Sequence, residues 1–134
     1  MTTVGSDTLQ VRSSDDVVRV RQRVRTLAIE AGLSLVDQTK VVTAASELAR
    51  NMIDYAGGGA CAFAIIGTPP RRGVRVTFED RGPGIANIEQ ALKDGYTTGN
   101  GLGLGLGGAK RLSSEFTIQS KPGEGTKITI TRWK

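Results

Sequence analysis

Glu47 and Asn51 stand four residues apart in a stretch whose apolar residues recur at helical spacing, so both lie on one face of the predicted helix. A carboxylate in this position has the chemistry to accept a proton from a water or a hydroxyl group. An amide oxygen one turn further on is a ligand that Mg²⁺ accepts. Considered alone, such a pair is more often an exposed pair on a helix surface, and that alternative stays open here.

A second candidate is the segment Asp80-Arg81-Gly82-Pro83-Gly84, which ends a predicted strand. The Asp80 carboxylate offers an acceptor for an exocyclic amine, and Gly82 and Gly84 let the chain turn past a flat ligand. A turn initiated by aspartate explains the same residues without any ligand. Both interpretations remain open on this segment alone.

A third candidate is the run from Gly101 to Gly108, in which five of the eight residues are glycine and leucine fills the other places. It leads into Ala109-Lys110-Arg111-Leu112, whose residues favour a helix. A glycine loop before a helix N-terminus presents free N–H groups that hold phosphate. A flexible linker is the alternative, although linkers are usually polar and do not alternate with leucine.

This glycine run does not match the commoner phosphate-binding loops. A Walker A loop needs Gly-Lys followed by Ser or Thr, whereas Lys110 follows alanine and precedes arginine. A dinucleotide-binding loop follows the first strand of a βαβ unit, whereas this run comes late in the chain. The sequence therefore predicts a phosphate site of another architecture.

Two predicted helices position the first of these candidates. Ser13 or Ser14 caps the first helix, which continues with apolar residues at helical spacing up to Gly32. Ser34 caps the second helix, which runs from about residue 35 to residue 55 and carries the Glu/Asn pair. Three consecutive glycines then end the second helix.

Strands are predicted where apolar residues alternate or run continuously between turn residues. Helices early in the chain and hairpins late in it favour an α+β fold, in which an antiparallel or mixed sheet has helices on one face. Residues 1–134 are expected to form a single domain. The predicted strands cover residues 9–12, 60–66, 74–79, 116–120 and 128–132, and a short helix is predicted at 88–93.

The composition excludes several classes of protein. The sequence contains no histidine, which excludes a Ser-His triad, a phosphohistidine relay and a histidine-ligated metal. A single cysteine, Cys61, excludes an intramolecular disulfide and fits a reducing cytosol. No apolar stretch reaches the length of a membrane span and the N-terminus has no signal-peptide pattern, so a cytoplasmic protein is expected.

The formal net charge is +5, and much of the arginine lies at residues 19–25 and 71–75. A basic surface fits nucleic acid, but three Phe, two Tyr and one Trp offer few stacking platforms. An acidic protein partner or a nucleotide explains the charge as well. The arginines at 19–25 fit a solvated helix face, with an acidic docking partner as the alternative.

In their order and spacing, these pieces resemble the Bergerat-fold (GHKL) ATP site of gyrase, Hsp90, histidine kinases and MutL. The resemblance covers nearly the whole chain and implies a two-layer α/β sandwich with a mixed, mostly antiparallel sheet. The matching motifs are Glu47-x-x-x-Asn51, Asp80-x-Gly82-x-Gly84, Gly101-x-Gly103-x-Gly105 and Gly125-Thr126.

The resemblance also implies ATP and Mg²⁺ as ligands and a role for each matched residue. Glu47 would polarise the attacking group, and Asn51 would coordinate Mg²⁺. Asp80 would bind the adenine amino group, with Thr126 and a water nearby. The remaining implied roles are room for adenine at Gly82 and Gly84, an ATP lid at about residues 94–105, phosphate contacts from Gly101, Gly103, Leu104 and Gly105, and help from Lys110.

The segment from Lys93 to Leu112, with its repeated Gly-Leu and its Ala-Lys-Arg-Leu, looks like the RsbT-type switch serine/threonine kinases of bacterial stressosomes. The related anti-sigma kinases are similar, and Gly107 stands where many relatives have proline. The resemblance implies phosphorylation of STAS-domain partners, release from them and activation of a PP2C-type phosphatase. A sigma factor is a further candidate partner; neither nucleic acid nor a membrane is expected. The alternative function is a non-catalytic, ATP-gated anti-sigma or phosphatase-binding module.

Overall fold

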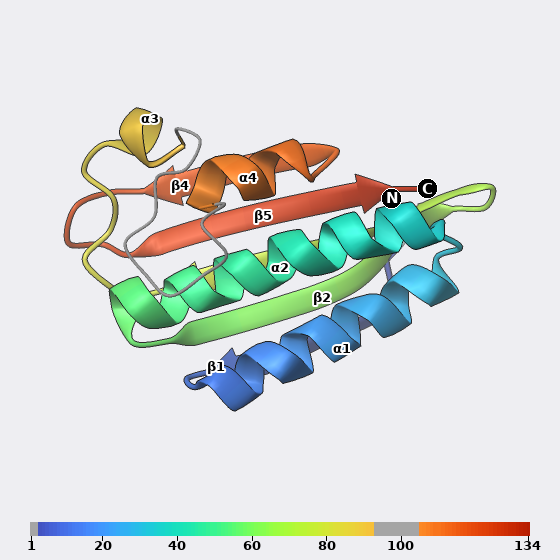
Figure 1. Cartoon of the computed structure of the whole chain (residues 1–134), viewed down its shortest axis with the longest axis horizontal. Helices are drawn as coiled ribbons and strands as arrows, with labels where there is room; N and C mark the ends of the chain where they lie inside the picture. The colour runs from blue at the N-terminus through green and yellow to red at the C-terminus, as the bar shows by residue number, and fades with distance from the viewer. Residues whose placement is uncertain (1–2, 93–104) are drawn as a thin grey trace.

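A computed structural model arranges the chain in two layers and describes residues 3–92 and 105–134. A five-stranded sheet forms one layer, and α-helices cover one of its faces (Figure 1). In chain order the elements are β1 (Thr3–Val11), α1 (Ser14–Glu30), α2 (Leu35–Ala56), β2 (Gly59–Thr68), β3 (Arg71–Asp80), α3 (Ile88–Ala91), α4 (Gly105–Arg111), β4 (Glu115–Ser120) and β5 (Thr126–Trp133).

Every pair of neighbouring strands in the described sheet is antiparallel, in the order β1-β2-β3-β5-β4. The α+β fold class is therefore confirmed, with the antiparallel rather than the mixed form of the sheet. Strand β5 inserts between β3 and β4. This order brings Asp80, Thr126 and Ser120 side by side, because Asp80 pairs with Thr126 and Thr126 pairs with Ser120.

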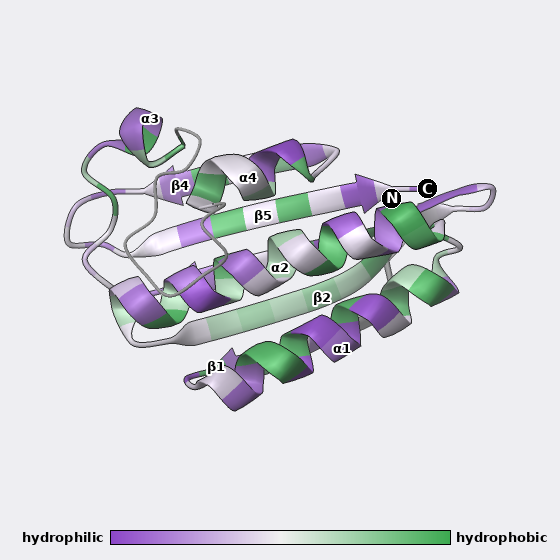
Figure 2. Ribbon diagram, in the orientation of Figure 1, coloured by the Kyte–Doolittle hydropathy of each residue, from purple (hydrophilic) through white to green (hydrophobic). Residues whose placement is uncertain are grey.

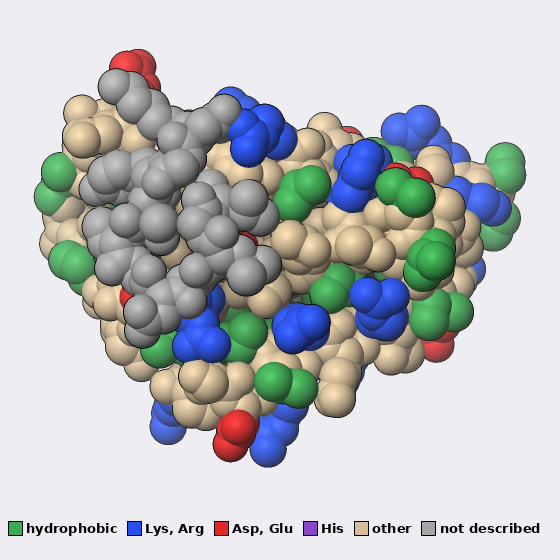
Figure 3. Space-filling model, in the orientation of Figure 1, with side chains coloured by type: hydrophobic (Ala, Val, Ile, Leu, Met, Phe, Trp, Pro, Cys, Tyr) green, Lys and Arg blue, Asp and Glu red, His purple; other side chains and the backbone are tan. Residues whose placement is uncertain are grey.

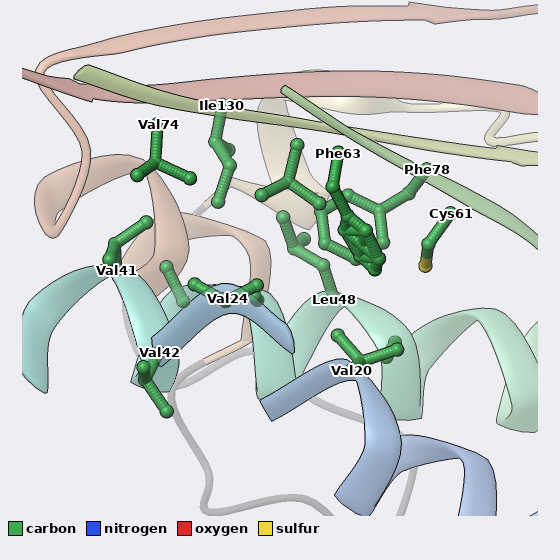
Figure 4. Close-up of a cluster of buried hydrophobic side chains, with 14 of the residues drawn as sticks. Val20, Val24, Val41, Val42, Leu48, Cys61, Phe63, Val74, Phe78 and Ile130 are labelled. Carbon is green, nitrogen blue, oxygen red and sulfur yellow. The ribbon is translucent and has the colours of Figure 1, made fainter. Parts of the chain in front are cut away.

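The hydrophobic core lies between the sheet and the helices, where aliphatic and aromatic side chains meet (Figure 4). Figure 2 shows β2 as hydrophobic along most of its length, as expected for the apolar run at 60–66. On α1, Val20 and Val24 are fully buried, whereas Arg21 between them is exposed. Burial raises the pKa of the Cys61 thiol to about 12, so this cysteine packs as an apolar residue and is no nucleophile.

Both long helices begin and end within about two residues of their predicted limits. Ser13 is the N-cap residue of α1, and its backbone N–H donates to the carboxylate of Asp16. Ser34 caps α2, with its Oγ accepting the N–H of Asp37 at 3.1 Å, and Gly57 ends α2 at φ +75°. None of the helices in residues 3–92 and 105–134 has the length and apolarity that a membrane span requires.

The arginines of α1 do not share one role. Arg19 forms an ion pair of 2.7 Å with Asp16 in the preceding turn, and Arg23 pairs with Asp7 of β1. These two side chains hold α1 to its own cap and to the edge of the sheet. A solvated face therefore does not describe all four arginines.

Strand β1 is longer than the predicted strand at residues 9–12. It begins at Thr3, which pairs with Ile66 of β2, and the register is irregular between Val4 and Asp7. The alternation of apolar and polar residues does not reveal the full length of this strand. Its length is set by hydrogen bonding to the backbone of β2, which is longer than the predicted strand.

The glycine run is not a loop throughout, which corrects the prediction that the helix begins at Ala109. Helix α4 begins at Gly105, and its Gly107 and Gly108 are buried where α4 packs against α2. Glycine lets two helix backbones approach closely, and this packing offsets its poor helix propensity. Helix α3 covers 88–91 of the predicted 88–93, and residue 93 lies outside the described residues.

Replacing Asp37 by Asn is expected to lower the free energy of unfolding at pH 7 by about 1 kcal/mol. Arg132 of β5 donates to the Asp37 carboxylate at 2.7 Å and lowers the pKa of Asp37 below its ordinary value of 3.8. A lowered pKa in the folded state contributes stability above pH 3.8, and this contribution is lost as the pH falls through the folded value.

Urea unfolding at pH 7 and at pH 3 checks this, with Asp15→Asn as the control. Asp15 is exposed in the first turn of α1, so it has a comparable place at a helix start but no ion pair among the described residues. The difference in the free energy of unfolding between wild type and Asp37→Asn should be smaller at pH 3 than at pH 7. A difference independent of pH would contradict the role given to the ion pair.

Candidate functional site

A cleft with two adjoining parts lies beside the C-terminal half of α2 and the loop that follows β3. One part measures about 50 Å³ and the other about 250 Å³. Both parts share a common set of lining residues, namely Asn51, Tyr55, Gly84, Ile85 and Leu106. The smaller part is otherwise mostly apolar, lined by Leu48, Met52, Ala56, Phe78, Asp80, Pro83, Thr126 and Ile128.

Asp80 and Thr126 place two polar side chains in the wall of the smaller part. They lie directly opposite each other on β3 and β5. Oδ1 of Asp80 accepts the backbone N–H of Gly82 at 2.9 Å, which fixes the orientation of the carboxylate. Its second oxygen is therefore placed to accept a hydrogen bond from a ligand.

The loop after β3 is clamped to the turn between β4 and β5. The backbone N–H of Ile85 donates to Oγ of Ser120 at 2.7 Å. The backbone N–H of Gly123 donates to the carbonyl of Pro83, also at 2.7 Å. Two segments far apart in the sequence are therefore held together, and the first of them supplies Pro83, Gly84 and Ile85 to the wall of the cleft.

Replacing Gly84 by alanine is expected to cost about 1–3 kcal/mol more stability than replacing Gly123. The two glycines have nearly equal φ, +76° and +78°, so the backbone strain of alanine is the same at both. A Cβ at Gly84 would overlap the carbonyl of Lys121, whereas one at Gly123 meets nothing within 4 Å. Urea unfolding of both variants measures the difference, and equal losses would show that the loop does not need this close approach.

Glu47 and Asn51 lie one turn apart on α2, and they are only 2% and 7% exposed. The backbone N–H of Gly105, the first residue of α4, donates to Oε1 of Glu47 at 3.3 Å. Asn51 borders both parts of the cleft, whereas Glu47 lies beside it where α2 meets α4. The alternative of an exposed pair on a helix surface is therefore wrong.

The residues of the cleft fit Mg²⁺ only together with a phosphate ligand. Within the described part of the chain, no three His, Cys, Asp or Glu side chains gather as a cation site. The amide of Asn51 is largely buried and faces the cleft, so it offers one oxygen ligand. One protein oxygen suffices when phosphate and water supply the rest of the octahedron.

The remaining predicted residues take different places. A Cβ at Gly82 would overlap the side chain of Ala56, so this glycine lets the loop pack on the end of α2. Gly105 is buried at the start of α4, and Lys110 is exposed in its last turn and is not among the residues that line the cleft. Most of the predicted lid, with Gly101, Gly103 and Leu104, lies outside the described residues.

Sequence reasoning missed the apolar and aromatic part of the wall. Tyr55 borders both parts of the cleft. It lies four residues after Asn51, so the helical spacing that paired Glu47 with Asn51 also points to it. Ile85 directly follows the predicted segment from Asp80 to Gly84, but its residue type does not distinguish it from a core residue.

The chain belongs to the histidine kinase-, DNA gyrase B- and HSP90-like ATPase family, whose model matches residues 36–134. The matched region holds every polar residue of the cleft. Serine/threonine-protein kinase RsbT of Bacillus subtilis is 42% identical over 125 residues, which cover 93% of this chain and 94% of that protein. Within the ATPase family, the chain therefore belongs with the RsbT-type serine/threonine-protein kinases.

Solved structures support the same fold. The RsbU and RsbW domains of a Mycobacterium tuberculosis protein match with a TM-score of 0.66 and 24% identity over 96% of this chain. The chain spans only 32% of that structure. The SiaB–SiaC complex of Pseudomonas aeruginosa matches with a TM-score of 0.53 and 14% identity, over 98% of this chain and 91% of that one. At these identities the likeness concerns the fold alone.

Proposed function

We propose that this chain transfers the γ-phosphate of ATP to a serine or threonine hydroxyl of a STAS-domain partner. The observation that carries the proposal is the convergence of Asn51, Asp80 and Thr126 on one cleft, with Glu47 buried one turn from Asn51. The 42% identity to a serine/threonine-protein kinase supports the reaction class.

The smaller part of the cleft would take the adenine. Its wall is mostly apolar, which suits a flat base, and its polar side chains are Asn51, Asp80, Thr126 and the hydroxyl of Tyr55. The second oxygen of the Asp80 carboxylate would accept a hydrogen bond from the exocyclic amine of the base. Met52 and Ile85 line the same wall and would cover apolar surface of the ring.

The triphosphate would extend from the adenine toward Asn51 and the start of α4. Asn51 would supply an amide oxygen to Mg²⁺, and the bound ion would neutralise charge on the phosphates. Glu47 would accept the proton of the partner's hydroxyl while the hydroxyl oxygen forms a bond to the γ-phosphorus. The bond from that phosphorus to the bridging oxygen breaks, and ADP leaves with the electron pair.

The flank of α1 that borders α2 carries two arginines that suit an acidic surface on a partner. Arg21 and Arg25 lie seven and eleven residues after Ser14, so all three share one helix face. Ser14 accepts a hydrogen bond of 2.9 Å from Arg50 of α2, so this face borders α2. Figure 3 shows Lys and Arg side chains spread over this side of the molecule, and neither Arg21 nor Arg25 forms an ion pair among the described residues. This observation favours the docking alternative for these two arginines.

The test is transfer of label from γ-labelled ATP to a purified STAS-domain protein, preferably one encoded beside this chain. We expect phosphoserine or phosphothreonine on the partner, and less of it when Arg21 and Arg25 are replaced by glutamate. The charge reversal should raise KM for the partner while binding of ATP is unchanged, because both arginines lie outside the cleft. ATP binding without any labelled partner would favour the second function, a non-catalytic, ATP-gated switch module.

We also propose a single domain over residues 1–134, a cytoplasmic location and activation of a PP2C-type phosphatase once the STAS partner releases the chain. Copurification with the STAS protein before incubation with ATP, and with the phosphatase afterwards, tests this order of partners. A sigma factor in either fraction would instead point to an anti-sigma role.

A further inference from the structure

Ser120 is the last residue of the edge strand β4, and it lies behind Thr126 as seen from the cleft. Among the described residues, its Oγ has three polar neighbours within hydrogen-bond distance. The backbone N–H of Ile85 is 2.7 Å away, the carbonyl of Gly125 is 3.0 Å away, and Oγ1 of Thr126 is 2.8 Å away. Ser120 therefore connects the loop after β3, the turn before β5 and the wall of the cleft.

The directions of these three hydrogen bonds follow from counting protons. A serine hydroxyl has one proton to donate and two lone pairs that accept. The N–H of Ile85 is a donor, and the carbonyl of Gly125 is an acceptor, so the Ser120 proton goes to Gly125. In the third bond the proton must then come from Thr126. Oγ1 of Thr126 is left with lone pairs, and no proton, for any other neighbour.

We propose that Ser120 is a positioning residue for base specificity, because it holds the Thr126 proton and so leaves only acceptors on the side chains of Asp80 and Thr126. The neighbouring side chain on β3 is the carboxylate of Asp80, which also accepts. Such a wall favours a purine with an exocyclic amine over one with a carbonyl at the same position. The carbonyl would face two acceptors and lose its hydrogen bond. This inference rests on the proposed binding of ATP in the cleft.

The experiment compares the dissociation constants of Mg·ATP and Mg·ITP, because inosine carries a carbonyl where adenosine carries the amine. In Ser120→Ala the Thr126 proton is free to turn toward that carbonyl. We expect the preference for ATP over ITP to fall about fivefold, the size of one neutral hydrogen bond. Any loosening of the Ile85 loop weakens both nucleotides alike and cancels in the ratio. Ser120→Thr keeps the hydroxyl and should retain the wild-type ratio.

Ser114→Ala is the matched control, because Oγ of Ser114 also accepts a backbone N–H, that of Trp133, at the far end of the same hairpin. It should leave the ratio unchanged. In a Thr126→Val background, Ser120→Ala should have no further effect on the ratio, since its action passes through the threonine hydroxyl.

The outcomes separate this inference from the proposed function. A wild-type protein that prefers ATP, together with an unchanged ratio in Ser120→Ala, would overturn the inference alone. A change in ratio that persists in the Thr126→Val background would also overturn it, because Ser120 would then act by another route. A wild-type protein that binds neither nucleotide would overturn the proposed function and the inference with it.

Discussion

Replacing Glu47 by Gln is expected to lower the rate of phosphotransfer by about 100-fold or more while ATP binding changes little. Glutamine has nearly the shape of glutamate, and its amide oxygen can still accept the N–H of Gly105 that Oε1 of Glu47 accepts now. The contact between α2 and α4 is therefore kept. What is lost is a carboxylate that can take the proton of the attacking hydroxyl.

Transfer of γ-labelled phosphate and calorimetry with Mg·ATP measure the two effects separately. Glu30→Gln is the control, because this glutamate is exposed at the end of α1, away from the cleft. A variant of Glu47 that transfers phosphate at the wild-type rate would show that another group takes the proton. A variant that loses ATP binding would instead give Glu47 a role in the nucleotide site itself.

The fold was predictable where its signals are local. Ser34 and Gly57 mark the ends of α2 by their residue types alone, since the first caps and the second adopts a positive φ. The apolar run at 60–66 predicts a buried strand in the same way. The starts of β1 and α4 were not predictable, because pairing with β2 and packing against α2 set them. Both partners are distant in the sequence.

The candidate site was predictable in its pieces and not in its assembly. Residue type and spacing single out Glu47, Asn51 and Asp80. The spacing of residues along the chain does not predict that β5 lies between β3 and β4. That insertion places Thr126 opposite Asp80. Ser120 had no signal at all, because in the sequence it is one more residue in an alternating strand. Its importance comes from three hydrogen bonds that only the folded chain makes.

Replacing Asp80 by Asn is expected to raise the dissociation constant of ATP by about 10- to 100-fold, the range for a hydrogen bond to a charged group. The N–H of Gly82 will still require an oxygen at the Oδ1 position, so the amide nitrogen of the new residue must take the other position. Its two protons would then face the exocyclic amine of adenine, which also donates. The variant therefore replaces a hydrogen bond with a repulsive contact while it preserves the turn.

Calorimetry with Mg·ATP measures the loss, and thermal unfolding establishes that the fold is retained. Glu79→Gln removes the same charge one residue earlier on β3, where the side chain is exposed and does not line either part of the cleft. That control should bind ATP as wild type does, since strand alternation directs its side chain to the opposite face of the sheet. Equal loss in both variants would mean that the general charge of this strand end attracts the nucleotide. Unchanged binding of ATP in Asp80→Asn would contradict the placement of adenine in this cleft. It would also contradict the placement of the phosphates near Asn51 and the start of α4, because that placement depends on the position of the adenine.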